Sequence, residues 1–270
     1  MQTASLTVSR MRIALGTYIA IESQASSREL ALHGIEAAFD AVASVDRLMH
    51  PTRPGSDLAA LAGATRGTRV PIHPWTWEVL DLSRDVGERS AGAFDPCLDS
   101  APGRLTDIDL SCRGFAVPRE RVHVDLGGIA KGFALDRAID AMRAAGCGGG
   151  LVNAGGDLAV FGLATHRIVR MSSEGVGAVV DLKDCALAAS DVECTNRPTE
   201  HRGYYHGVDR GRTIAGSATV IAPSAAVADA LTKCVLLADP GLEQSLLEAF
   251  GARALRQDLR TPGPAPDRSA

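Results

Sequence analysis

The segment VDLGGIAKG, residues 124–132, combines residue types that together can bind phosphate. Asp125, two glycines and Lys131 stand where an expected strand meets an expected helix. Glycines let a ligand approach the backbone, the free N–H groups of a first helical turn attract anions, and Lys131 adds a full positive charge. The pattern is neither GxGxxG after a first strand nor GxxxxGKS/T, which argues against a Rossmann or P-loop unit. The alternative is a glycine-rich helix start that serves packing alone.

Asp229 and Lys233 stand four residues apart on an expected helix, with the acid before the base. This order is typical of a surface ion pair, which contributes about 0.2–0.5 kcal/mol to helix stability. A second interpretation uses the position of Asp229, about one turn after the helix start and near a strand end. A carboxylate there can hold a divalent cation against phosphate oxygens.

His206 in the segment YYHGVD has an acidic neighbour in Asp209. A neutral histidine can act as a general base, although most single histidines are not catalytic.

Two loops are ambiguous in the same way, GAFDP at 92–96 and NAGGDL at 153–158. Turn chemistry alone explains Asp-Pro and Gly-Gly at these positions, so neither loop needs a ligand.

The composition is that of a soluble globular protein, with 46% apolar and 22% charged residues over 270 positions. A net charge of −4 and 4% aromatic residues argue against a nucleic-acid-binding protein. No run approaches the ~20 apolar residues of a membrane span, and the start has no signal-peptide pattern, so we expect a cytoplasmic protein. The six cysteines form no CxxC pair, which argues against a disulfide framework or a zinc site.

The first quarter of the chain reads as a strand followed by a long helix. Residues 11–22 have a strand pattern interrupted at Gly16, which predicts one strand with a glycine kink. A helix is expected from Ser27 to about Met49, and Ser26 with Glu29 has the spacing of a capping box. The prolines that follow end this helix.

Short strands and helices alternate over the rest of the chain. The pattern predicts a helix after Pro74, a strand at 121–126, and a helix from there to Ala145 whose outer face carries Asp136 and Arg137. Two short strands around a Gly-Gly turn are expected in 150–162, and a strand at 218–223. Ser224 can then cap a helix that ends at Leu237.

Taken in order, these segments resemble the ApbE family, the FAD:protein FMN transferases. The resemblance spans nearly the whole chain, and its two strongest blocks are those around 125–136 and 151–158. The matching segments are LGT at 15–17, MHPTRPGSDL at 49–58, GAFDP at 92–96, VDLGGIAKGFALD at 124–136, LVNAGGDL at 151–158, HGVD at 206–209 and TVIAPSAAVADAL at 219–231.

The resemblance implies an α+β fold of mixed or antiparallel sheets with packed helices and an extended FAD cleft. It implies one domain over residues 1–260, and the Pro-rich residues 261–270 read as a disordered tail. In such enzymes the hydroxyl of a Thr or Ser on an acceptor flavoprotein attacks the FMN phosphorus of FAD, and AMP leaves. Mg²⁺ is expected at the pyrophosphate, since phosphoryl-type transfer needs charge neutralisation.

Site roles carry over to the positions that match the family's motifs. The residues that would line the flavin nucleotide are Leu15, Ala93, Phe94 and Asp95. Those that would also contact FAD are Asp125 and Lys131, and the metal ligands would be the carbonyl of Gly128 and the carboxylate of Asp229. His206 would handle the proton of the attacking hydroxyl.

The chain departs from the family's pattern at several positions. Thr52 stands where the family usually has a stacking Tyr, and Arg210 and the segment Ala189-Ser190-Asp191 also differ. Most important, Lys233 occupies the place of a Thr or Ser that ligates the metal. We expect Lys233 to compete with Mg²⁺ and partly to replace it, and Thr232 to be a weak substitute because one residue turns a helix by ~100°.

Three functions stay open from the sequence. The first is a working FMN transferase with a weakened need for metal. The second is a family member that binds FAD, or hydrolyses it to FMN and AMP, without modifying a protein. The third is a non-catalytic partner that recognises an acceptor flavoprotein and binds no FAD.

Overall fold

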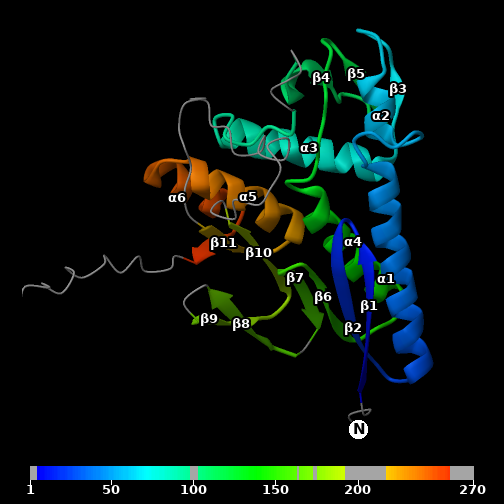
Figure 1. Ribbon diagram of the computed structural model, residues 1–270, viewed down its shortest axis with the longest axis vertical. Coiled ribbons are helices and arrows are strands. Elements are labelled where there is room, and N and C mark those ends of the chain that lie inside the picture. Colours follow the sequence, from blue (N-terminus) through cyan, green and yellow to red (C-terminus); the bar gives the residue numbers. More distant parts are fainter. Residues whose placement is uncertain (1–4, 98–102, 163, 173–174, 192–216, 256–270) are drawn as a thin grey trace, which may run out of the picture.

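The computed structural model describes residues 5–97, 103–162, 164–172, 175–191 and 217–255. Its helices pack on antiparallel sheets, as Figure 1 shows, and this confirms the predicted α+β class. Within these residues no helix has the length and apolar character needed to cross a membrane.

A seven-stranded sheet forms the base of the molecule (Figure 1). Every neighbouring pair in it is antiparallel. In spatial order its strands are β1 (Leu6–Ala14), β2 (Thr17–Ala25), β6 (Gly149–Ala154), β7 (Asp157–Gly162), β10 (Cys185–Asp191), β11 (Ser217–Ala222) and β12 (Arg253–Leu255). The two short strands predicted around the Gly-Gly turn are β6 and β7, and the predicted strand at 218–223 is β11.

The expected single strand over 11–22 is in fact a hairpin of β1 and β2. Leu15 and Gly16 have φ of +51° and +70° and form its two-residue turn. Positive φ at both turn positions matches the twist of the flanking strands, which is why this turn type joins hairpins. The interpretation as a glycine kink was wrong because leucine rarely adopts a positive φ, so Leu15 gives no turn signal in the sequence.

Three long helices cover one face of the sheet. They are α1 (Arg28–Leu48), α4 (Ala130–Ala144) and α5 (Ala225–Leu237). α1 lies against β1 and β2, α4 against β6 and β7, and α5 against β10 and β11. Side chains of β2 alternate between the two faces of the sheet. Ile19 and Ile21 face the helices and are completely buried, whereas Tyr18 is exposed.

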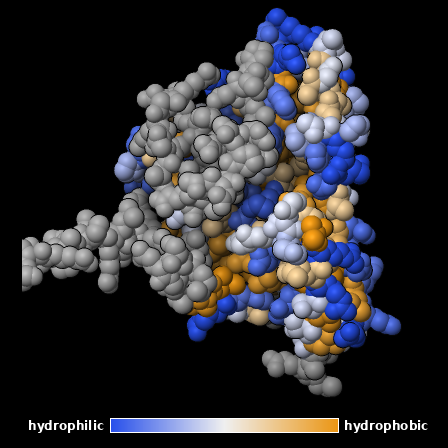
Figure 2. All heavy atoms as spheres, viewed as in Figure 1, coloured by the Kyte–Doolittle hydropathy of each residue, from blue (hydrophilic) through white to orange (hydrophobic). Residues whose placement is uncertain are grey.

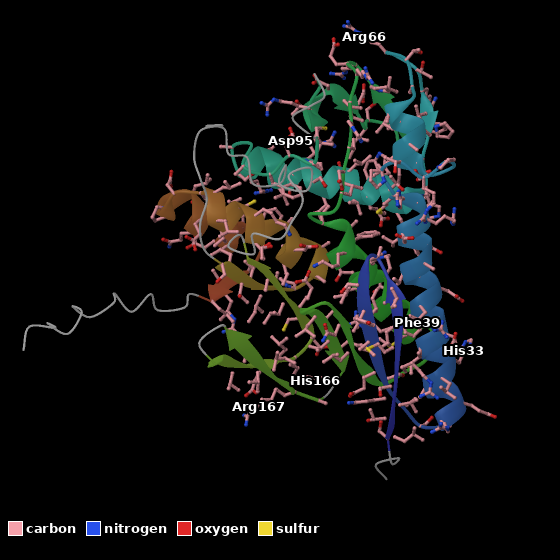
Figure 3. The ribbon with its side chains drawn as sticks, viewed as in Figure 1. His33, Phe39, Arg66, Asp95, His166 and Arg167 are labelled. Atoms are coloured by element: carbon pink, nitrogen blue, oxygen red, sulfur yellow. The ribbon has the colours of Figure 1, made fainter. Side chains whose placement is uncertain are left out.

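A second hairpin of β8 (His166–Ser172) and β9 (Gly175–Leu182) covers part of the other face. Val180 and Leu182 on β9 form a small apolar cluster with Leu158 and Val160 on β7. β7 is therefore buried on both sides, because its alternate residues, such as Phe161, belong to the main core under the helices. Figure 3 places His166 and Arg167 on this hairpin, away from the helices.

The remaining elements lie beyond the helical layer or at the end of the sheet (Figure 1). A three-stranded sheet of order β3-β5-β4 lies on the far side of α3. The bounds are α2 (Asp57–Ala62), β3 (Val70–Pro71), α3 (Pro74–Arg89), β4 (Ile108–Asp109), β5 (Phe115–Pro118) and α6 (Pro240–Ala249). A 3-10 turn at Leu105–Asp107 precedes β4.

Two local predictions need correction. Residues 121–126 form no strand, and Val124 makes only an isolated bridge to Cys97. Val122, Val124 and Leu126 are apolar because they are buried in the main core, and periodicity cannot distinguish such a buried loop from a strand. The cap of α1 is Ser27, whose hydroxyl accepts from the Leu30 N–H at 3.1 Å, and not Ser26. The predicted cap of α5 is confirmed, since the Ser224 hydroxyl accepts from the Val227 N–H.

Candidate functional site

The helices α4 and α5 approach each other so closely at their starts that one position requires glycine. A Cβ on Gly132 would lie 2.1 Å from the carbonyl oxygen of Ala225. One turn further along α4, the Asp136 carboxylate accepts from the N–H groups of Ala225 and Ala226 at 2.7 and 2.9 Å. Asp136 therefore caps α5, and its predicted place on an outer polar face was wrong.

Burial raises the pKa of Asp136 from its ordinary value of 3.8 to about 6, and its two backbone hydrogen bonds oppose this rise. A carboxylate at a helix N-terminus is favoured by the helix dipole. Here that interaction also fixes the relative position of the two helix starts.

Asp229 and Lys233 of α5 form a buried pair. The two residues are 2% and 5% exposed, and the Lys233 ammonium contacts Asp229 Oδ1 closely. Lys233 also donates to the backbone carbonyl of Asp229 at 2.8 Å. The interpretation of this pair as a surface ion pair was wrong, since the helix face that carries both residues is covered by the rest of the fold.

A second Lys–Asp pair lies beside the first. Lys131, at the start of α4, is in ion-pair contact with Asp157 at the start of β7, and its ammonium lies 3.9 Å from Asp229 Oδ2. Asp157 Oδ1 also accepts from the Ala189 N–H at 3.0 Å. We name Lys131, Asp157, Asp229 and Lys233 the Lys–Asp cluster. It joins α4, α5 and β7, and its formal charges sum to zero.

The start of α4 uses most of its N–H groups inside the protein. Gly132 N–H donates to Asp229 Oδ2 at 3.2 Å, while the N–H groups of Ala130 and Phe133 donate to backbone carbonyls. These three donors are therefore engaged. A ligand phosphate at this helix start would be attracted mainly by the Lys131 ammonium, whose side chain is 30% exposed.

The hairpin turn at Leu15 lies next to this cluster. A Cβ on Gly155 would be 2.7 Å from Thr17 Oγ1, so the β6–β7 turn packs directly on the end of the β1–β2 turn. Asp157 follows that turn by two residues. The structure thus connects the end of the β1–β2 turn, through the β6–β7 turn and Asp157, with Lys131. The expected contact of Leu15 with the flavin nucleotide stays a prediction.

The GAFDP loop meets the segment before α4. Asp125 N–H donates to the Pro96 carbonyl at 2.8 Å, and the Asp125 carboxylate accepts from Gly127 N–H at 2.9 Å. Asp95 accepts from Cys97 N–H and is half-buried beyond α3, where Figure 3 labels it. Ala93 and Phe94, expected to line the flavin nucleotide, are 8% and 3% exposed.

The cysteines near this region are protonated thiols. Burial, helped by the negative charge of Asp95, raises the pKa of Cys97 well above its ordinary value. Burial also raises the pKa of Cys234 to about 12. Neither thiol can supply a thiolate nucleophile near neutral pH, and all five cysteines in the described part of the chain are free.

The residues present at Asp229 do not fit a divalent cation. Mg²⁺ requires oxygen ligands in octahedral arrangement. Asp229 Oδ1 is in contact with the Lys233 ammonium, and Oδ2 accepts a backbone N–H. Thr232 is directed elsewhere, with its hydroxyl bonded to Ser190 and to the Asp229 carbonyl, both at 2.7 Å. In the described ranges no three His, Cys, Asp or Glu residues gather as metal ligands.

Several predicted positions lie apart from this region. Thr52 lines a cavity of about 280 Å³ together with Arg121 and His123. His206, the expected proton-handling residue, and Arg210 lie outside the described residues. Gly128 is buried just before α4, and its role as a metal ligand stays a prediction.

Sequence reasoning missed two carboxylates of this region. The sequence pattern predicts only a Gly-Gly turn next to Asp157 and a solvated helix face at Asp136. The signal for Asp157 was an acid at the first position of an otherwise fully apolar strand, DLAVFG. An acid in that position is rarely buried without a partner.

Together, the fold and the site define an antiparallel α+β protein with paired lysines and carboxylates where two helices begin. The sequence pattern of the ApbE family matches residues 15–103 and 103–255. The chain therefore belongs to the ApbE family.

Individual relatives are distant in sequence. The chain is 24% identical to a FAD:protein FMN transferase of Treponema pallidum (strain Nichols), over 90% of this chain and 82% of that protein. It is 23% identical to one of Chlamydia pneumoniae, over 86% and 82%. The solved flavinyl transferase ApbE of Pseudomonas stutzeri, in its apo form, superposes with a TM-score of 0.76 at 19% identity, covering 93% and 90% of the two chains. This last similarity confirms the fold.

Proposed function

We propose that the chain transfers FMN from FAD to a Thr or Ser hydroxyl of an acceptor flavoprotein and releases AMP. Family membership and the names of its relatives support this proposal. The observation that carries it is the Lys131 ammonium, which is partly exposed at a helix start beside the two glycine turns. A cation at such a place suits the negatively charged pyrophosphate of FAD.

The transfer makes one bond and breaks one. The acceptor's hydroxyl oxygen bonds to the FMN phosphorus, and the bond from that phosphorus to the bridging oxygen breaks. AMP leaves with the bridging oxygen and its electron pair. In this proposal Lys131 offsets the negative charge on the phosphate oxygens, and His206 takes the hydroxyl proton.

The test is an assay for two products. The purified chain is incubated with FAD and a domain that carries an acceptor Thr, and AMP and flavin-labelled acceptor are measured by mass. Lys131→Gln should lower the transfer rate by at least about tenfold, because it removes a charge from the phosphate site. Lys183→Gln, which removes an exposed lysine, is the matched control and should leave the rate unchanged.

Flavin-labelled acceptor formed at the same rate by Lys131→Gln would contradict the role of Lys131. Circular dichroism of the variant must match the parent chain, because Asp157 loses its partner in this variant.

A second function is favoured by one observation, the Lys233 ammonium at Asp229. A site altered in this way suits a family member that binds FAD, or hydrolyses it to FMN and AMP, without labelling a protein. The same assay separates the two functions. AMP with free FMN indicates hydrolysis, and bound but intact FAD indicates a binding protein. A cytoplasmic location and a single domain over residues 1–260 stay part of the proposal.

A further inference from the structure

We propose that Lys233 is an internal cation that takes the place of a divalent metal ion at Asp229. It follows that a diphosphate bound at this site meets the Lys131 ammonium and no metal ion. The statement about the diphosphate rests on the proposed function. The statement about Lys233 concerns the protein without a ligand and does not depend on the proposed function.

The first argument is that the Asp229 carboxylate is saturated by the protein. Lys233 contacts Oδ1 and also donates to the Asp229 carbonyl at 2.8 Å. Oδ2 accepts the Gly132 N–H at 3.2 Å and has the Lys131 ammonium at 3.9 Å. A metal ion would have to displace the Lys233 ammonium, since both need the same oxygen atoms at short distance.

The second argument is electrostatic. The Lys–Asp cluster already balances two positive charges with two negative charges. A divalent ion would add two positive charges beside two ammonium groups where Asp229, Lys233 and Asp157 are at most 5% exposed. Like charges at short range repel strongly where water is excluded. The neutral cluster therefore disfavours a cation.

The third argument is the different exposure of the two lysines. The side chain of Lys233 is 7% exposed and that of Lys131 is 30% exposed. Lys233 is thus placed to hold Asp229, which in turn holds the start of α4 through Gly132. Lys131, at that helix start, is the ammonium that a ligand can reach. The two lysines share one cluster but have separate roles.

The experiment titrates Mn²⁺ alone into the protein and follows free Mn²⁺ by electron paramagnetic resonance. The parent chain should show no saturable site at millimolar Mn²⁺. Lys233→Thr removes the ammonium and supplies a hydroxyl ligand, so it should bind Mn²⁺ at least about tenfold more tightly than the parent chain. Lys233→Met removes the ammonium without supplying an oxygen ligand, and it should gain less affinity than Lys233→Thr. Lys183→Thr is the surface control and should behave as the parent chain does.

Thermal unfolding gives a second readout. Lys233→Thr leaves Asp229 without its partner, so its melting temperature should fall, and Mg²⁺ should restore part of the loss. The melting temperature of the parent chain should not respond to Mg²⁺. If Lys233→Thr does not fold, the parent chain still decides the question, because saturable Mn²⁺ binding that Asp229→Asn abolishes would overturn the proposal.

The statement about the ligand is tested by FAD binding with excess Mg²⁺ and with a chelator. The dissociation constant should be the same in both conditions within about twofold. FAD that binds only with Mg²⁺ would overturn the second statement, and equal Mn²⁺ affinity of the parent chain and Lys233→Thr would overturn the first. If flavin transfer alone fails, the proposed function is contradicted, but both statements about Lys233 and the diphosphate stand.

Discussion

Lys131 and Lys233 have the same side chain but opposite surroundings. Lys233 is buried with Asp229, and both belong to α5. Lys131 on α4 contacts Asp157 of β7, and part of its side chain stays exposed to solvent. Each carboxylate also accepts a backbone N–H, from Gly132 or from Ala189. The charges of the cluster thus position backbone segments as well as one another, and removing one charge should affect more than one element.

Asp157→Asn should destabilise the chain by about 1–3 kcal/mol, because it removes the buried partner of Lys131. The amide oxygen of Asn can still accept the Ala189 N–H, so the effect reports mainly the lost charge. Urea unfolding measures the change. Asp181→Asn on β9, whose carboxylate pairs with Arg167 in the solvent, is the control and should leave the midpoint unchanged. Equal midpoints for all three proteins would show that the Lys131–Asp157 pair does not stabilise the fold.

The raised pKa of Asp136 makes the free energy of unfolding depend on pH. Its pKa is raised from 3.8 to about 6 in the folded chain, so between these values the folded state binds more protons than the unfolded state. Stability due to this group should therefore fall as the pH rises from about 4 to about 6, by on the order of 1–3 kcal/mol. Asp136→Asn should flatten this part of the profile, measured as urea midpoints against pH. An unchanged slope would refute the assignment.

At the scale of elements, the site depends on how two helices begin. α4 and α5 start against each other at Gly132 and Ala225, and Asp136 of α4 caps the first turn of α5. Lys131 and Asp229 lie within the first two turns of these helices. Their distance of 3.9 Å is therefore set by the helix contact, and a change that separates the helices should disturb the cluster.

Gly132→Ala should lower the stability by about 1–3 kcal/mol, because its Cβ would overlap the Ala225 carbonyl and force the helices apart. FAD binding should weaken in the same variant, since Lys131 moves with the helix start. Gly241→Ala in α6 is the matched control, because its Cβ meets nothing closer than 3.5 Å. That variant should be neutral or more stable by up to about 1 kcal/mol. Chemical denaturation of both variants checks the difference.

At the scale of the whole molecule, one apolar core connects the elements. It runs from Ile19 on β2 through Ile35 on α1 and Leu135 on α4 to Leu231 on α5, and it includes Val79 on α3. On the face drawn in Figure 2, apolar and hydrophilic residues are mixed over α1 and the β1–β2 hairpin. A continuous core of this kind predicts cooperative unfolding.

The described part of the chain should unfold in a single transition. Trp75 and Trp77 both lie on α3 (Figure 1), and Trp75 contacts Phe133 of α4 edge-on, so their fluorescence reports the packing of α3 on its neighbours. Far-ultraviolet circular dichroism reports all helices and strands. The two signals should give the same urea midpoint. Separate midpoints would indicate two units and would contradict the single domain expected over residues 1–260.

Local patterns in the sequence were enough for four of the helices and for the Gly-Gly turn, but they gave no prediction of α2 or α6. α1, α3, α4 and α5 follow from their apolar spacing, and Ser224 and Pro74 mark helix starts, because caps and proline act on the neighbouring backbone alone. The strands around Gly155 and Gly156 follow for the same reason. The residue types and the family resemblance also single out Lys131, Asp229 and Lys233 as candidate site residues.

Burial and pairing depended on the folded arrangement. Asp157 meets Lys131 across 26 positions of sequence, and Asp136 reaches Ala225 across 89. Such partners are determined by the packing of helices and strands, and nothing in the local sequence shows which distant residue the partner is. The Asp229–Lys233 spacing was visible at once, but whether the pair lies in water or in the interior depends on what packs over α5. Because Asp229 and Lys233 are buried in the folded chain, Lys233 is an internal cation and not one half of a surface ion pair.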